Sequence, residues 1–244
     1  MRLGDARPGA PAREGVAAGR VRSLVAGIAA AIFDLDGVLV DTEPCWHEVR
    51  VAWAASRGLA WSEDDSRACM GRNSREWAEV MRRRLAVDET PAAIEAGIVE
   101  ALVARYAARG VPLVPGAPAA AAAIAARVPV AIASSGHPAV IRAALEAAGM
   151  AGLFRVVVSS DDVAAGKPAP DVYLEAARRL GVEPARCLVL EDSRNGVLAG
   201  RAAGMRVVLI PNASVPPGAG AAEAADVVIE HLADLPESAL GAGG

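Results

Sequence analysis

The stretch AIFDLDGVLVDT, residues 31–42, places two aspartates directly after a short, continuous run of apolar residues. A run that is apolar at every position indicates a strand buried on both faces, here residues 29–33. In an extended chain, residues i and i+2 point the same way, so Asp34 and Asp36 can both reach into one cavity at the carboxyl end of this strand. Open parallel sheets bind their ligands at that edge, so the stretch predicts both a sheet and the centre of a site.

Short apolar runs of the same kind recur further along the chain and alternate with helical patterns. We expect helices between the runs at residues 117–127, 138–149, 170–180 and 194–203. The runs themselves predict strands at 128–133, 154–158, 187–190 and 207–210, with an edge strand at 226–229. This alternation predicts an α/β fold, a Rossmann-like parallel sheet covered by helices on both sides.

The sequence pattern changes between residues 43 and 113, after the first predicted strand. This block contains no convincing strand, and its helical patterns lie at about residues 45–57, 63–69, 74–86 and 91–109. A helical block inserted at this point is expected to form a cap domain over the carboxyl ends of the strands.

The domain limits follow from these patterns and from the composition of the first residues. We predict a mostly disordered tail at 1–27, rich in Gly, Ala, Pro and Arg. The α/β core is predicted at 28–44 plus 113–237, and the helical cap at 45–112.

Composition excludes several classes of protein. The net charge of −4 over 244 residues gives no reason to expect a nucleic-acid or membrane partner. No apolar stretch approaches the ~18 residues that cross a bilayer. The three cysteines are odd in number and form no CxxC pattern, which indicates reduced thiols. We expect a cytoplasmic protein that is a monomer or a weak homo-oligomer.

A second strand end carries further acids. Glu191 and Asp192 follow the apolar run 187–190 and should reach the same edge as Asp34 and Asp36. Four carboxylates at one place repel each other unless a cation holds them. Mg²⁺ prefers oxygen ligands and retains several waters, so we predict a magnesium site with these four acids as its ligands.

Groups suited to an anion lie at the other strand ends. Ser134 and Ser135 precede a predicted helix, where hydroxyls, free backbone N–H groups and the helix dipole favour an anion. Lys167 is the single lysine of the chain, in the loop GKPAPD at 166–171. Its compact ammonium delivers a point charge that the wide guanidinium of arginine does not. These groups predict a small phosphorylated substrate bound beside Mg²⁺.

Four segments together carry a resemblance to a known family. They are FDLDGVLVDTEP (33–44), IASSGHP (132–138), GKPAPDVY (166–173) and LEDSRNG (190–196). In this order they resemble motifs I to IV of the haloacid dehalogenase superfamily, which contains phosphohydrolases with an aspartate nucleophile. With the helical insertion after motif I, residues 28–235 resemble the branch of β-phosphoglucomutase and small sugar-phosphate phosphatases.

The resemblance implies a role for each matched residue. Asp34 would be the nucleophile that forms an aspartyl-phosphate, and Asp36 would be the general acid and base. Asp192 would bind the metal, with Glu191 either a weaker ligand or a group that orients its neighbours. Ser134, the N–H of Ser135 and Lys167 would hold the phosphoryl oxygens, which completes the list of core residues.

Three residues of the cap region are weaker candidates for binding the substrate. Arg75 matches, with a one-residue gap, the cap arginine that grips the distal phosphate in the mutases, although a surface arginine is an equal alternative. Trp46 and His47 follow the first acidic loop and can line the entrance, although for Trp46 the role of a core anchor of its helix, together with Trp53, is favoured.

The leading function is therefore a Mg²⁺-dependent phosphomonoester hydrolase for a small phosphorylated metabolite, such as a sugar phosphate. The nearest rival is a phosphoglucomutase-type enzyme. The resemblance to mutases is weaker because Trp46 stands where they have histidine and because the cap has no lysine. A non-catalytic phosphate-sensing protein is the alternative from another class, but it would have no reason to keep Asp34, Asp36, Lys167 and Asp192 together.

Overall fold

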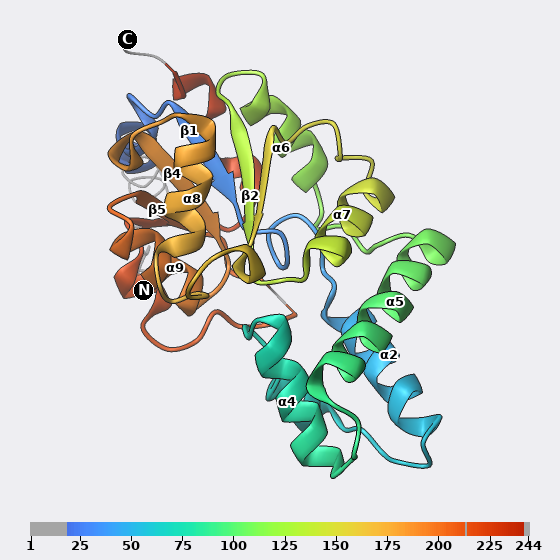
Figure 1. Cartoon of the computed structure of the whole chain (residues 1–244). Helices are drawn as coiled ribbons and strands as arrows, with labels where there is room; N and C mark the ends of the chain where they lie inside the picture. The colour runs from blue at the N-terminus through green and yellow to red at the C-terminus, as the bar shows by residue number, and fades with distance from the viewer. Residues whose placement is uncertain (1–18, 213, 242–244) are drawn as a thin grey trace, which may run out of the picture.

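The computed structural model describes residues 19–212 and 214–241. Its centre is a parallel sheet with the strand order β3-β2-β1-β4-β5-β6 (Figure 1). The strands are β1 (Ala30–Phe33), β2 (Val130–Ser134), β3 (Val156–Ser159), β4 (Cys187–Glu191), β5 (Arg206–Leu209) and β6 (Val227–Val228). The predicted α/β fold is confirmed, and β6 is the edge strand expected at residues 226–229.

The strand order changes direction beside β1. The chain runs outward from β1 to β2 and β3, then returns to the other side of β1 for β4, β5 and β6. At such a switch point the connections leave in opposite directions and open a crevice at the carboxyl ends of the strands. Phe33 of β1 pairs with Leu190 of β4, so the segments that begin at Asp34 and Glu191 leave the sheet side by side.

Alternate side chains of β1 pack into opposite faces of the sheet. Ala31 and Phe33 belong to the apolar cluster that contains α6 (Ala117–Ala125) and α7 (Pro138–Ala147). Ala30 belongs to the cluster of the other face, with α8 (Asp171–Leu180), α9 (Arg194–Ala202) and α10 (Ala221–Ala224). All four residues of β1 are fully buried, which is why the strand is apolar at every position instead of alternating.

The first four helices after β1 form a separate lobe, which faces the lower end of the sheet in Figure 1, whereas α6 packs on the sheet before β2. They are α2 (Glu43–Ala55), α3 (Glu63–Arg67), α4 (Ser74–Leu85) and α5 (Pro91–Arg109), close to the four predicted helical patterns. The long helix α5 packs against both α2 and α4. Thr90 caps its N-terminus by accepting from the backbone N–H of Ala93, and the chain turns out of the helix at Gly110 with φ +71°. The limits of this lobe as an independent domain stay a prediction.

The predicted disordered tail is wrong for its last part. Residues 19–25 are helical, and Val21 and Val25 are buried in the core. Together with the buried Ile28 they follow the spacing i, i+4, i+7, which puts them on one face of a helix. The rest of the predicted tail, 1–18, lies outside the described residues. The core also extends past its predicted end at 237, because the N–H of Gly241 donates to the carbonyl of Ile28.

Two predictions from composition bear on the class of protein. In the described ranges, no helix is both long enough and apolar enough to cross a lipid bilayer. The three cysteines, Cys45, Cys69 and Cys187, are buried and form no disulfide, as their number and spacing predicted.

Candidate active site

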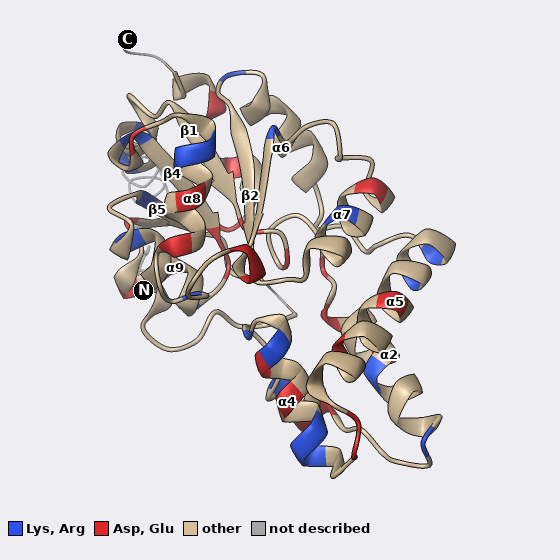
Figure 2. Ribbon diagram, in the orientation of Figure 1, with Lys and Arg blue, Asp and Glu red and all other residues tan. Residues whose placement is uncertain are grey.

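A pocket of about 300 Å³ lies at the strand ends that face the cap. Figure 2 shows acidic segments gathered in this part of the core. The pocket brings together most of the residues that the sequence predicted for the site, from four strand ends and from α2: Asp34, Asp36, Trp46, Ser134, Ser135, Lys167, Glu191 and Asp192.

Lys167 forms the central contact of the pocket. Its Nζ lies 2.5 Å from Asp34 Oδ1 and 2.7 Å from Glu191 Oε1, and its side chain is only 4% exposed. The ammonium also lies 4.9 Å from the centre of the Tyr173 ring. Burial opposes the charge of Lys167, but its two carboxylate partners raise its pKa well above the usual value. The only lysine of the chain is therefore a buried cation that joins β1 to β4.

Glu191 is held by donors on both of its oxygens. Oε1 accepts from Lys167 and, at 2.9 Å, from the hydroxyl of Tyr173, while Oε2 accepts from the N–H and hydroxyl of Ser193 at 2.9 Å each. Burial would raise the pKa of Glu191, but these partners lower it below the usual range. Because its acceptor positions are taken, the arrangement fits the orienting role better than the predicted role as a metal ligand.

The short loop after β1 fixes Asp36 and brings Asp192 close. Thr42 donates its hydroxyl to Asp36 Oδ1, and the N–H of Gly37 donates to the carbonyl of Val40 at 2.7 Å. Gly37 has φ +83°, and a Cβ placed on it would lie 2.0 Å from Asp192 Oδ2. Only glycine fits this turn, because it tolerates the backbone conformation and leaves room for the carboxylate.

The carboxylates carry more negative charge than Lys167 can balance. Burial is the largest cause that raises the pKa of Asp34, to about 7, and it also raises the pKa of Asp36. The pKa of Asp192 is raised well above its usual value by burial and by the neighbouring acids. Among the described residues, no hydrogen-bond donor reaches the side chain of Asp192 or Asp34 Oδ2. Free carboxylate oxygens with excess negative charge suit a hard divalent cation, so the residues present fit Mg²⁺.

The loop after β2 supplies the candidate anion site. Ser134 is 1% exposed, and its Oγ accepts from the N–H of Gly136 at 3.0 Å. The carbonyl of Gly136 in turn accepts from Ser159 of β3 at 2.6 Å. His137 and Pro138 then begin α7, which directs the N-terminal end of this helix toward the strand ends.

The three cap candidates differ in whether they line the pocket. Trp46 lines the pocket and packs edge-on against Trp77 at 5.6 Å, so it also serves as an anchor of the cap. His47 does not line the pocket, because its Nδ1 lies 2.8 Å from the hydroxyl of Ser66. Arg75 is exposed and does not line it either.

Sequence reasoning missed two charged residues of the pocket on α2, the half-buried Glu43 and the buried Arg50. Arg50 is 3% exposed, although arginine is almost never buried without a partner. Its position beside Trp46 and Trp77 depends on how α2 packs against α4. No local sequence signal could have identified it.

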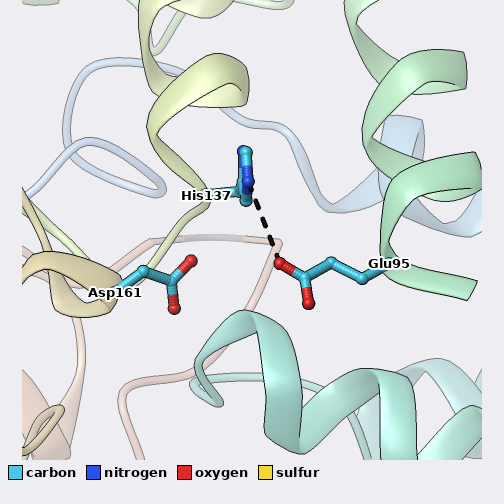
Figure 3. A group of neighbouring side chains, drawn as sticks. All are labelled: Glu95, His137 and Asp161. Carbon is cyan, nitrogen blue, oxygen red and sulfur yellow. Dashed lines mark ion pairs between the residues drawn. The ribbon is translucent and has the colours of Figure 1, made fainter. Parts of the chain in front are cut away.

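A second group of polar residues joins the cap to the core. In the part of the chain that the structure describes, Glu95, His137 and Asp161 are the one group of potential metal ligands whose atoms all lie within 4.8 Å. Figure 3 shows Glu95 of α5 facing His137, with 3.8 Å between Oε1 and Nε2. Asp161 accepts from the hydroxyl of Ser74 of α4 at 2.6 Å.

The hydrogen bonding of His137 argues against a metal at this second group. Its Nδ1 accepts from the N–H of Ala139 at 3.2 Å, a hydrogen bond that assigns a proton to Nε2. Nε2 then has no lone pair for a metal, and it points its N–H toward Glu95. The group is therefore a polar contact between the two lobes and not the predicted magnesium site.

Comparisons with known proteins extend this description. A family model described as haloacid dehalogenase-like hydrolase matches residues 28–204. The chain is 34% identical over 196 residues to Hexitol phosphatase B of Escherichia coli K12, which covers 75% of this chain and 84% of that protein. It is 47% identical over 109 residues, 44% of this chain, to a bifunctional riboflavin kinase/FMN phosphatase of Arabidopsis thaliana, but spans only 28% of that protein.

A solved structure has the same arrangement over most of its length. CbbY from Rhodobacter sphaeroides in complex with phosphate matches with a TM-score of 0.74 at 28% identity. The match covers 86% of this chain and 96% of that chain.

Proposed function

Because the chain belongs to the haloacid dehalogenase-like hydrolase family, we propose that it hydrolyses phosphate monoesters through an aspartyl-phosphate on Asp34. The supporting observation is the contact of Lys167 with both Asp34 and Glu191, at 2.5 and 2.7 Å, in a pocket at the switch point of the sheet. This contact puts a buried cation beside a carboxylate that has a free oxygen. The positive charge of Lys167 would offset the repulsion between this carboxylate oxygen and the negatively charged phosphoryl group that approaches it.

In the first step, a free oxygen of Asp34 attacks phosphorus and the ester oxygen leaves. Asp36 protonates the leaving oxygen, which requires that its carboxyl group starts in the acid form. Burial raises the pKa of Asp36 and so favours this form, while the bond from Thr42 fixes the direction of the carboxyl group. In the second step, Asp36 removes a proton from the attacking water, and hydrolysis of the acyl phosphate returns Asp34 as a carboxylate.

The phosphoryl oxygens would be held by Lys167, Ser134 and the N–H of Ser135. Glu191 would act indirectly, since its four donors fix it in the position that orients Lys167. Mg²⁺ would be held by Asp34, Asp192 and the carbonyl of Asp36, and when bound it supplies positive charge that offsets the developing charge of the transferred group. This assignment makes Asp34 and Asp36 the catalytic residues.

We further propose a sugar phosphate or a related small phosphorylated metabolite as the substrate. The pocket volume of about 300 Å³ is at the lower end for small-molecule sites. Hexitol phosphatase B, a relative that covers 75% of this chain, is by its name a phosphatase of the same substrate class. A cytoplasmic location and a monomeric or weakly associated state stay predictions.

The proposal is tested by measuring phosphate release from a panel of sugar phosphates and simple monoesters, with Mg²⁺ and without a bisphosphate activator. The wild type should release phosphate, and Asp34→Asn should not. Incubation with substrate should also label the wild type, but not Asp34→Asn, with one acid-stable phosphoryl group.

Wild-type turnover by Asp34→Asn, after deamidation is excluded by mass spectrometry, would contradict the assignment of the nucleophile. Conversion of β-glucose 1-phosphate to glucose 6-phosphate with negligible phosphate release would instead show the mutase.

A further inference from the structure

Arg50 lies in the wall of the active-site pocket under two tryptophans of the cap. Its guanidinium carbon lies 4.8 Å from the centre of the Trp46 ring and 5.6 Å from that of Trp77. The two rings meet edge to face, so together they hold the flat guanidinium in one orientation. Arg50 is therefore a fixed cation that is positioned by packing and not by an ion pair.

The guanidinium forms no ion pair with an acid among the described residues. Its Nε is buried without a hydrogen-bond partner, and no carboxylate in residues 19–212 and 214–241 lies within 4.0 Å of its nitrogens. Burial lowers the pKa of Arg50, but a guanidinium remains protonated at neutral pH. A buried charge without a partner is costly, so an arrangement that keeps one inside a binding pocket indicates a partner that arrives with the ligand.

Glu43 is the acid of the same helix that also lines the pocket. Its Oε2 is likewise buried without a partner, and burial raises its pKa to about 7. A carboxyl group that is about half protonated at neutral pH neutralises Arg50 only in part. The positive charge therefore remains available to a ligand, and Glu43 offers that ligand a hydrogen-bonding group.

We propose that Arg50 determines substrate specificity by binding a second anionic group of the substrate. The inference rests on the proposed function, in which Asp34 and Lys167 interact with the phosphoryl group that is transferred. Arg50 would bind another oxyanion of the same substrate at the cap end of the pocket. A guanidinium binds a carboxylate or a phosphate with two parallel hydrogen bonds. The substrate class is therefore a phosphorylated sugar acid or a bisphosphate, in preference to the phosphate of a neutral polyol.

The other cap arginines are less suited to this role. Arg72 also lines the pocket, but its Nε donates to the carbonyl of Ala68 at 2.9 Å and its side chain is exposed. Arg75, the arginine expected from the sequence to hold a distal phosphate, is exposed and outside the pocket lining. Arg50 is the cap arginine of the pocket that is both buried and unpaired among the described residues.

The test compares kcat/KM for matched pairs of esters that differ in one anionic group. One arm uses 6-phosphogluconate against glucose 6-phosphate and 3-phosphoglycerate against glycerol 3-phosphate, which tests a carboxylate. The other arm uses fructose 1,6-bisphosphate against fructose 1-phosphate, which tests a second phosphate. The wild type should prefer the more anionic member of at least one arm by tenfold or more, about 1.4 kcal/mol.

Arg50→Met should reduce this preference at least tenfold, mainly through KM, because the lost interaction is made equally in the ground state and the transition state. Arg50→Lys should keep only part of it, since an ammonium cannot form the paired hydrogen bonds. Arg83→Met is the matched control. It removes the same charge from the same lobe, but the side chain of Arg83 is 74% exposed and pairs with Glu79. This control should leave the preference unchanged.

A wild type without a preference for the more anionic member in either arm would overturn the inference, and this comparison needs no variant. An equal fall in kcat/KM for all substrates in Arg50→Met, together with a lower melting temperature, would show a purely structural arginine. In both cases phosphate release by the wild type would still support the proposed function. Failure of the wild type to hydrolyse any ester would contradict the proposed function and this inference with it.

Discussion

Replacing Lys167 by arginine tests the geometry of the site without changing its net charge. The lysine Nζ is buried between two carboxylates at 2.5 and 2.7 Å, and the Tyr173 ring closes the third side. A wider guanidinium cannot occupy this position without displacing one of these groups. Overpacking a buried site costs about 1–3 kcal/mol, which corresponds to a fall in melting temperature of roughly 2–12 °C for a protein of this size.

The same change should reduce turnover. If the ammonium holds the phosphoryl group beside Asp34, its displacement in Lys167→Arg should lower kcat/KM by at least about tenfold, or roughly 1.4 kcal/mol of transition-state stabilisation. Lys167→Met should lower the free energy of unfolding further, by about 3–5 kcal/mol, because it leaves buried carboxylates without their cation. The variants Lys167→Arg and Lys167→Met therefore separate the shape of the side chain from its charge.

The assay is phosphate release and a thermal melt on the same preparation. Arg178→Lys is the control, because the side chain of Arg178 is 72% exposed and such changes alter stability by less than about 0.5 kcal/mol. Wild-type values of both kcat/KM and melting temperature for Lys167→Arg would refute the reasoning, because the site would then tolerate either cation.

Three further predictions concern the metal, a glycine and the thiols. Chelation should abolish phosphate release and Mg²⁺ should restore it; full activity after exhaustive chelation would exclude a metal requirement. Gly196→Ala should destabilise the fold by about 1–3 kcal/mol or more, since its Cβ would lie 1.6 Å from Glu191 Oε1, whereas Gly152→Ala meets nothing within 4 Å and should melt like the wild type. Because burial raises the pKa of Cys187 to about 11 and also raises the pKa of Cys45 and Cys69, a thiol reagent should modify the cysteines only after denaturation, and rapid labelling of the native protein would contradict this.

The sheet could be predicted from the sequence because each strand carries its own signal. The strands are buried on both faces, so each appears as a short apolar run, and the helices between them keep the period of an amphipathic face. The proximity of the acids at the ends of β1 and β4 could be predicted because all strands of a parallel sheet have their carboxyl ends at one edge. Prediction succeeded where local patterns and the regular geometry of a sheet were sufficient.

The helix at residues 19–25 was missed for a different reason. The glycine, proline and arginine that precede it dominate the composition of the segment, while its apolar face consists of only a few residues. These residues become informative once Val21 and Val25 are known to be buried in the core. Average composition over a window hides a short amphipathic segment at its end.

The contacts that decide between the roles of Glu191, and those that bury Arg50, could not be predicted because they join separate elements of the fold. The family resemblance left Glu191 as either a weaker metal ligand or an orienting group. The donors from Lys167, Tyr173 and Ser193 engage Glu191 and leave Asp192 free, which favours the orienting role. Arg50 likewise differs from the exposed cap arginines only in what surrounds it. In both cases the informative quantity is how completely a buried charge is balanced: the balanced carboxylate orients its neighbours, and the unbalanced groups are the candidates for binding a ligand.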